Sequence, residues 1–281
     1  MLVSAVCFTC MNSIIRYVDH LPTFELVFFR SIGSVICCVF VLMKLKISPV
    51  GNNPKILIAR GVVGLISLAL FYKALQMMPM ASAVSLRYLS PFFAAAMAII
   101  FLKEKMYSLQ WLFYLSAFAG VLLLKGFDSR ITINGLFIIL LSAVFSGAVY
   151  VLIRKIGNTE HPIVVVSYFM IISASVGGIV SIFDWVQPQG IQWLLLSLIG
   201  IFGFVAQYFM TRALQIEEAN LVTPFKYSEV IFTLLAGWAM FGEQQTLLAI
   251  MAMALIIVSL IANIVTNQKM KSRTPLGIES K

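Results

Sequence analysis

The sequence consists almost entirely of apolar runs of about 20 residues that are separated by short polar breaks. A helix of that length crosses the hydrocarbon core of a bilayer, which is about 30 Å thick. Only 11% of the residues are charged and 61% are hydrophobic, whereas about a quarter of the residues in a soluble domain are charged. The chain is therefore expected to be an all-α membrane protein, in which helices satisfy the backbone polar groups.

Turn-forming residues divide the apolar sequence into ten segments. The break at 47–54, for example, holds two prolines, a glycine and two asparagines. The expected transmembrane helices are 1–17, 23–43, 55–77, 80–102, 107–125, 133–154, 162–183, 190–213, 219–241 and 245–266. No break between them is long enough for a second folded domain.

Lysine and arginine are expected mostly on one side of the bilayer, and such a bias marks the cytoplasmic side. With the amino terminus inside, twelve basic residues are cytoplasmic: Lys44, Lys46, Lys55, Arg60, Lys103, Lys105, Arg154, Lys155, Lys269, Lys271, Arg273 and Lys281. Three basic residues fall outside, namely Arg16, Lys125 and Arg130, and five lie within spans, namely Arg30, Lys73, Arg87, Arg212 and Lys226. Both termini are therefore predicted to be cytoplasmic, in a bacterial cytoplasmic (inner) membrane. Topology thus accounts for the net charge of +9, and no basic face for a nucleic-acid partner is expected.

The two halves of the sequence match each other at a nearly constant spacing. An offset of 139 places Arg87-Tyr88 on Lys226-Tyr227, Gly64 on Gly203 and Glu104 on Glu243, and an offset of 138 places Ser4 on Ser142 and Arg16 on Arg154. Because each half holds five helices, an odd number, the halves must enter the membrane from opposite sides. We therefore expect a 5+5 inverted-topology repeat, which is found mainly in transporters. A duplicated bundle without a transport function is the alternative.

The ends of the two halves resemble motifs of a known family. Residues 220–243 (NLVTPFKYSEVIFTLLAGWAMFGE) look like the closing motif of the EamA family of the drug/metabolite transporter superfamily. Residues 81–104 carry this motif more loosely, with Lys103 where the family usually has glycine, and Phe28-Phe29-Arg30 resembles its pattern in the second helix. The resemblance implies two five-helix repeats, 1–126 and 133–266, followed by a basic cytoplasmic tail at 267–281. It also implies transport of small organic solutes, which in the family include amino acids, purine-like compounds, riboflavin and S-adenosylmethionine.

Charged side chains within the spans are expected to face a cavity or a partner, because a bilayer penalises them. Glu229 lies about nine residues into its expected helix, near the midplane, and Lys226 lies one turn before it on the same face. The two residues either bind substrate or form an ion pair with a purely structural role. Arg87 occupies the position of Lys226 in the other half, and Arg30 is similarly deep in the second helix.

Tyrosines accompany these charges at equivalent positions of the two halves. Tyr88 and Tyr227 each combine a flat apolar ring with a hydroxyl group, which suits a partly aromatic metabolite, although core packing is the alternative. The predicted substrate-binding residues are Arg30, Arg87, Tyr88, Lys226, Tyr227 and Glu229. Cations outnumber acids in this set, which favours a solute with a carboxylate or phosphate, while Glu229 leaves a cationic solute open.

Other features of the sequence concern packing. Pro91 and Pro224 fall inside expected helices and predict kinks. Small residues within 142–147 and 173–178 predict either close helix packing or a homodimer face. Cys7 and Cys10 are interpreted as apolar packing rather than a redox or metal pair, and we expect no metal, no cofactor and no nucleotide-binding loop.

The sequence thus predicts a secondary transporter, or permease, that moves a small organic metabolite across the cytoplasmic membrane by alternating access, without enzymatic activity. Proton coupling through Glu229, exchange and facilitated diffusion remain open. A non-transporting membrane assembly subunit is one alternative, and it would not depend on Lys226 or Glu229. A membrane-embedded lipid-modifying enzyme is another, but the acids are scattered over the helices, and His20 and His161 lie at span edges.

Overall fold

The computed structural model describes residues 1–90, 92–94, 96–97, 108–216 and 225–273, and every regular element in these ranges is a helix. The α-helices are α1 (Leu2–Tyr17), α2 (Thr23–Leu45), α3 (Pro54–Met77), α4 (Met80–Arg87), α6 (Ser108–Phe127), α7 (Ile133–Ile156), α8 (Pro162–Ser181), α9 (Gln192–Ile216), α11 (Ser228–Phe241) and α12 (Leu247–Arg273). A 3-10 helix, η1 (Gly157–Thr159), joins α7 to α8. Each of the ten segments expected from the sequence overlaps one of the α-helices.

Proline marks the start of four of these helices. Pro22 and Pro79 directly precede α2 and α4, while Pro54 and Pro162 are the first residues of α3 and α8. The first backbone N–H groups of a helix have no partner inside it, so a residue without an N–H is tolerated there. Short signals in the sequence therefore set these boundaries.

The surface and interior of the bundle are those of a membrane protein. Six helical segments are long and apolar enough to cross a bilayer: Thr23–Leu45, Pro54–Met77, Ile133–Thr159, Pro162–Ser181, Gln192–Ala213 and Leu247–Thr266. Large apolar side chains such as Phe40, Leu122 and Phe137 are exposed, whereas serines such as Ser34, Ser142 and Ser173 are buried. The chain is a multi-pass integral membrane protein.

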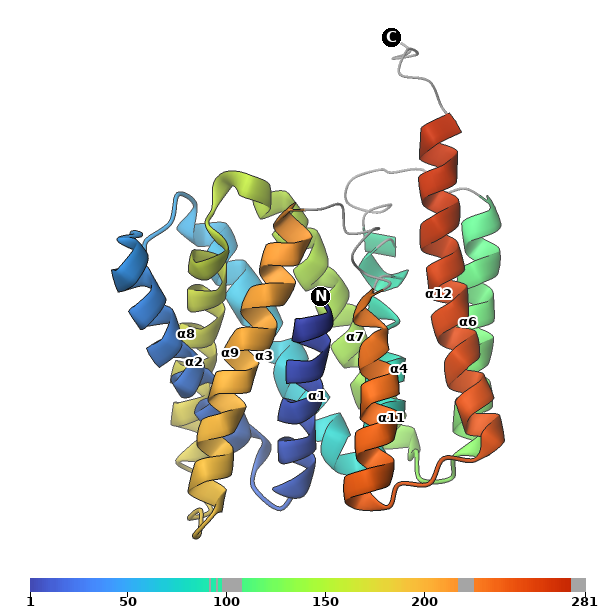
Figure 1. Cartoon of the computed structure of the whole chain (residues 1–281), viewed down its shortest axis with the longest axis horizontal. Helices are drawn as coiled ribbons and strands as arrows, with labels where there is room; N and C mark the ends of the chain where they lie inside the picture. Colours follow the sequence, from blue (N-terminus) through green and yellow to red (C-terminus); the bar gives the residue numbers. More distant parts are fainter. Residues whose placement is uncertain (91, 95, 98–107, 217–224, 274–281) are drawn as a thin grey trace.

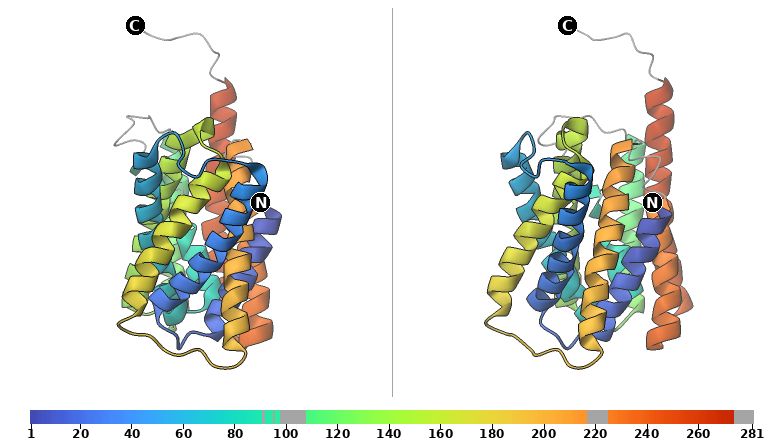
Figure 2. Two further views of the ribbon diagram at one scale, coloured as in Figure 1. Left: turned by 90° about the vertical axis from the view of Figure 1, so that its left-hand side faces the viewer. Right: turned by 60° about the vertical axis from the view of Figure 1, so that its left-hand side comes forward.

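The helices form one bundle whose centre is built from both halves of the chain (Figure 1). At one edge α2 packs against α8, and at the other edge α6 packs against α12. Between these pairs, α1 packs against α9 and α11, and α3 packs against α7 and α8. The helices run roughly along one common direction, and the connection between α8 and α9 crosses the end of the bundle away from the carboxyl terminus (Figure 2).

Glycines allow the closest helix crossings. A Cβ atom on Gly200 of α9 would lie 2.7 Å from the Cα atom of Gly33 of α2, so neither residue tolerates a side chain at this crossing. A Cβ atom on Gly177 of α8 would lie 3.0 Å from the backbone nitrogen of Phe28, and one on Gly147 of α7 would lie 2.9 Å from the carbonyl oxygen of Ser90. The small residues predicted to serve either helix packing or a dimer face therefore pack within the chain at these points.

Polar links join the two halves at both ends of the bundle. We call the end that carries Lys44, Lys46, Lys55 and Lys155 the basic end. There, Glu160 Oε1 accepts hydrogen bonds from the backbone N–H groups of Asn52 and Asn53 at 2.6 Å and 2.7 Å.

At the opposite end, the carboxylate of Glu243 connects three segments. Its Oε1 atom lies 3.2 Å from Nε of Arg16 in the last turn of α1, and its Oε2 atom accepts a hydrogen bond of 3.1 Å from the backbone N–H of Met80. Arg16 also donates from Nη1 to the carbonyl oxygen of Leu75, at 3.1 Å. The segment after α11 is thereby tied to α1 and to the start of α4.

Candidate functional site

Two of the expected helices are interrupted at equivalent tyrosines. The predictions of continuous helices at 80–102 and 219–241 are wrong, because α4 ends at Arg87 and α11 begins at Ser228. The ring of Tyr88 meets that of Tyr227 edge to face, with the centroids 5.0 Å apart and the planes at 84°. A break in a membrane helix leaves backbone polar groups without helical partners, which is tolerated where the backbone is buried in protein or lines a cavity.

At the first break a serine hydroxyl satisfies a backbone carbonyl group. The hydroxyl of Ser90 donates a hydrogen bond of 2.6 Å to the carbonyl oxygen of Arg87, and the residue four positions after Arg87 is Pro91, which has no N–H to donate to that carbonyl. The kinks predicted at Pro91 and Pro224 lie outside the described residues.

A central cavity lies where the breaks face each other. Its described lining comes from α1, α2, α3, α4, α7, α8, α9 and α11, together with residues at the breaks: Phe8, Met11, Arg30, Arg60, Gly64, Ser67, Leu68, Phe71, Val84, Arg87, Tyr88, Ser90, Ser146, Val149, Tyr150, Phe169, Gln207, Met210, Lys226 and Glu229. Four basic groups and one acidic group are in this set, so the described lining carries a positive excess. The volume is about 60 Å³, enough for a few water molecules, so a metabolite requires the walls to move apart.

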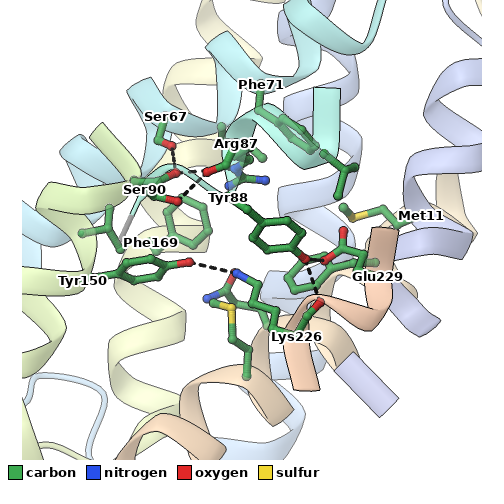
Figure 3. Close-up of a pocket in the computed structure, with 18 of the residues that line it drawn as sticks. Met11, Ser67, Phe71, Arg87, Tyr88, Ser90, Tyr150, Phe169, Lys226 and Glu229 are labelled. Carbon is green, nitrogen blue, oxygen red and sulfur yellow. Dashed lines mark hydrogen bonds between the residues drawn. The ribbon is translucent and has the colours of Figure 1, made fainter. Parts of the chain in front are cut away.

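The acid of the cavity is held by residues from two other segments, and Figure 3 shows the contact with one of them, Tyr88. Glu229 is 5% exposed, its Oε1 atom accepts a hydrogen bond of 3.2 Å from Nδ2 of Asn12, and its Oε2 atom accepts one of 2.7 Å from the hydroxyl of Tyr88. The same hydroxyl lies 2.9 Å from the carbonyl oxygen of Lys226. Glu229 thus connects α11 to α1 and to the break after α4.

The basic residues at the two breaks have partners of their own. Nζ of Lys226 donates a hydrogen bond of 3.0 Å to the hydroxyl of Tyr150 (Figure 3), and no ion pair to Glu229 occurs among the described residues. Arg87 Nε lies 3.4 Å from the hydroxyl of Ser146, and its Cζ atom lies 4.0 Å from the ring centroid of Phe71. Lys226 and Glu229 therefore form no ion pair with each other in the described structure, although their spacing along the chain allows one.

Arg60 lines the cavity and was not among the predicted binding residues. It was counted among the cytoplasmic basic residues, although it falls within the expected helix 55–77, and the structure makes it the seventh residue of α3 and only 2% exposed. Its Cζ atom lies 4.3 Å from the ring centroid of Phe169, and that of Arg30 lies 5.4 Å from the same centroid. Its distance from Pro54, almost two helical turns, was the signal that could have identified it as a deep charge of the cavity.

The structure brings five of the six predicted binding residues to the cavity. Arg30, Arg87, Tyr88, Lys226 and Glu229 line it, whereas Tyr227 is not in the described lining and packs behind Tyr88. Arg60, Asn12, Tyr150 and Gln207 are further polar residues at the cavity that were not predicted, as are three serines of its lining, Ser67, Ser90 and Ser146. Each is a polar residue within an expected span, which is the signal that points to them.

The sequence and the fold of this chain can be compared with those of known proteins. The EamA-like transporter family matches the chain twice, over residues 1–125 and 133–265. The chain belongs to this family. The family resemblance seen in the sequence motifs is thereby confirmed.

Characterised relatives of this EamA-like protein are named as transporters. The Pseudopaline exporter CntI of Pseudomonas aeruginosa is 29% identical over 258 residues, which covers 91% of each chain. Solute carrier family 35 member G1 of Homo sapiens is 28% identical over 263 residues, covering 87% of this chain and 72% of the relative. The S-adenosylmethionine uptake transporter of Rickettsia felis is 25% identical over 226 residues, covering 80% and 76%.

The fold also occurs in a solved structure. One crystal structure superposes with a TM-score of 0.68 at 17% sequence identity and covers 97% of this chain and 99% of its own. At that identity the likeness concerns the fold alone.

Proposed function

We propose that this chain is a secondary transporter that binds a small organic metabolite in the central cavity and exposes it alternately to the two sides of the cytoplasmic membrane. The observation that carries the proposal is a charged cavity between two opposed helix breaks, with walls from both halves of the chain. Broken helices and a binding site between repeats are typical of secondary transporters. The proposed activity involves no chemical change of the solute, and relatives named as exporters and uptake transporters support this class.

The proposal includes a repeat of five helices in each half, 1–126 and 133–266, in inverted orientation. Two equivalent hydrogen bonds support it. The hydroxyl of Ser4 donates to the carbonyl oxygen of Ala206 at 2.8 Å, and the hydroxyl of Ser142 donates to the carbonyl oxygen of Ser67 at 2.8 Å. The offset of 138 relates the two serines, and the offset of 139 relates Ser67 to Ala206.

The close crossings of the helices follow the same relation. Gly200 of α9 meets Gly33 of α2, and Gly61 of α3 meets Ile172 of α8, where the offset of 139 relates Gly61 to Gly200 and Gly33 to Ile172. The two family matches, one in each half, give further support.

Alternating access would use the polar links at the two ends of the bundle. The link between Arg16 and Glu243 joins the first half to the second at the opposite end, and the link between Asn52 and Glu160 joins them at the basic end. We propose that the halves rock against each other, so that one link separates while the other holds. Each conformation is then favoured by its own set of contacts.

We further propose that the basic end faces the cytoplasm, with both termini on that side. The support is the concentration of lysine at that end and its scarcity near Arg16 and Arg130. Reporter fusions that are active only in the cytoplasm, placed after Lys281 and in the 182–191 connection, test this orientation. Activity of the second fusion alone would reverse it.

The transport proposal is tested by untargeted metabolite profiling of cells and medium. Wild-type protein is compared with Glu229→Gln and Lys226→Ala at matched membrane levels, and with Phe40→Leu as a control at a 63% exposed lipid-facing position. We expect at least one solute to shift between cells and medium with wild type and with the control, and not with the two cavity variants. No shift under several nutrient conditions would favour an assembly subunit, which needs neither charged residue.

A further inference from the structure

Two arginines of the central cavity share one aromatic ring and have no acidic partner in the described structure. Arg30 of α2 and Arg60 of α3 are 1% and 2% exposed, and both stack on Phe169 of α8. Among the described residues, Nε and Nη1 of both arginines have no hydrogen-bond partner, and no ion pair involves either residue. Because arginine keeps its proton in proteins, two positive charges are buried side by side.

The other charged groups that line the cavity do not neutralise this pair. Both oxygens of Glu229 accept hydrogen bonds from Asn12 and Tyr88. Lys226 donates to Tyr150, and its positive charge cannot offset that of an arginine. In the described lining, Nε and Nη1 of both arginines thus remain without partners, and negative charge is lacking next to them.

Space for the two guanidinium groups depends on glycines at equivalent positions of the two halves. A Cβ atom on Gly64 would lie 3.0 Å from Nη1 of Arg60, and a Cβ atom on Gly203 would lie 3.1 Å from Nε of Arg30. The offset of 139 relates these two glycines, and it also relates Arg30 to Phe169, the ring on which it stacks. The pair therefore occupies a shaped position on the wall of the cavity rather than a chance gap between helices.

We infer that Arg30 and Arg60 together bind the carboxylate or phosphate group of the transported solute, with Phe169 as the surface that orients both guanidinium groups. An anionic oxygen pair accepts two parallel hydrogen bonds from a guanidinium fork, and both forks retain free N–H groups. A buried charge without a partner is costly, so the solute anion supplies the negative charge that the described part of the chain does not. The inference rests on the proposed transport function and narrows it to solutes that carry an oxyanion.

Binding can be measured without transport. The melting temperature of the purified full chain in detergent is recorded in chloride, in inorganic phosphate and in citrate, at equal ionic strength. When the concentration of phosphate or citrate is several times its dissociation constant, we expect the melting temperature to be about 2–4 °C higher than in chloride. The rise should vanish in Arg30→Gln and Arg60→Gln and persist in Lys155→Gln, which removes an exposed charge at the basic end.

Arg60→Lys keeps the positive charge and removes the planar fork, so it guards against the possibility that a glutamine variant does not fold. Loss of protection in this variant supports binding through the fork. Protection by phosphate alone or by citrate alone identifies which oxyanion the site accepts. The inference is overturned if neither phosphate nor citrate raises the melting temperature above its value in chloride, or if the rise survives in both glutamine variants.

The two proposals fail in different ways. If anions protect through the arginine pair and no solute shifts in the metabolite profiles, the site stands and the transport function does not. If a solute without an oxyanion is transported equally by wild type and by Arg60→Lys, transport stands and the arginine pair has another role.

Discussion

The ion pair between Arg16 and Glu243, at the end of the bundle away from the basic end, is expected to control access to the cavity from that end. Glu243→Gln keeps the shape of the side chain and an acceptor for the N–H of Met80, but it removes the ion pair with Arg16. Glu243→Ala removes both interactions. If the link holds the two halves together, both variants should favour the state that is open at this end, and alanine should have the larger effect.

The magnitude follows from the burial of the two partners. The side chain of Glu243 is 7% exposed and that of Arg16 is 23% exposed, so the pair lies between an exposed pair, worth about 0–1 kcal/mol, and a buried one, whose rupture costs about 3–5 kcal/mol. We take about 1–2 kcal/mol for the glutamine variant, which corresponds to about a 5- to 30-fold shift in population. The alanine variant also leaves the Met80 N–H without its acceptor, which adds about 1–3 kcal/mol.

Cysteine labelling measures this shift. Cys7, Cys10, Cys37 and Cys38 are replaced by alanine, and Val84, which lines the cavity one turn inside Met80, is replaced by cysteine. A membrane-impermeant maleimide is then applied from each side of the membrane. We expect the labelling rate from the opposite end to rise about 5- to 30-fold with Glu243→Gln and further with Glu243→Ala.

A neighbouring residue and a double variant provide the controls. Gln244→Ala changes an exposed side chain next to Glu243 and should leave the rate unchanged. Arg16→Gln combined with Glu243→Gln should have about the effect of one substitution, because both remove the same pair. A rate that stays within twofold of the parent in both Glu243 variants, or additive effects in the double variant, would refute the link as a gate.

Three further predictions concern the cavity and its supports. Tyr88→Phe should reduce transport strongly, because the buried carboxylate of Glu229 loses its 2.7 Å hydrogen-bond donor at a cost of about 1.5–3 kcal/mol. Tyr227→Phe should have little effect, since the hydroxyl of Tyr227 has no described partner. Initial uptake or efflux rates at matched expression check this. Gly200→Ala should lower the free energy of unfolding by about 1–3 kcal/mol, because its Cβ atom would overlap a glycine backbone of α2. Gly126→Ala should be neutral, because its Cβ atom would meet nothing within 4 Å. Melting curves of both variants test this difference. Arg60→Met should raise the melting temperature of the unliganded chain. Removal of an unpaired buried charge stabilises the chain by about 1–2 kcal/mol more than the lost contact with the ring of Phe169 destabilises it. A lower melting temperature would show that the charge already has a partner.

The positions of the helices could be predicted from the sequence because they depend on local properties. Apolar runs of membrane length and prolines at helix starts define α2, α3 and α8 within two residues of the expected bounds. The deep charges Arg30, Arg87, Lys226 and Glu229 could be expected at a cavity for the same reason, since each is costly wherever it meets lipid.

The partners of those charges depend on the three-dimensional arrangement and could not be predicted. Spacing along one helix allowed Lys226 to pair with Glu229, yet Glu229 is held by Asn12, 217 positions earlier in the chain, and Lys226 by Tyr150. The interruptions at Tyr88 and Tyr227 were also missed, because the groups that meet there are far apart in the sequence: the two rings meet edge to face, and the hydroxyl of Tyr88 lies 2.9 Å from the carbonyl oxygen of Lys226.

The sequence by itself determined that this chain lies in a membrane, where most of its helices begin, and which deep ionisable residues must avoid lipid, because hydropathy and helix geometry act over a few turns. Only the tertiary structure decided that Arg60 joins Arg30 on Phe169 and that Glu243 ties α11 to α1 and α4. The physical reason is that these contacts join helices from distant parts of the chain, and hydrogen bonds and stacking are effective only over a few ångströms.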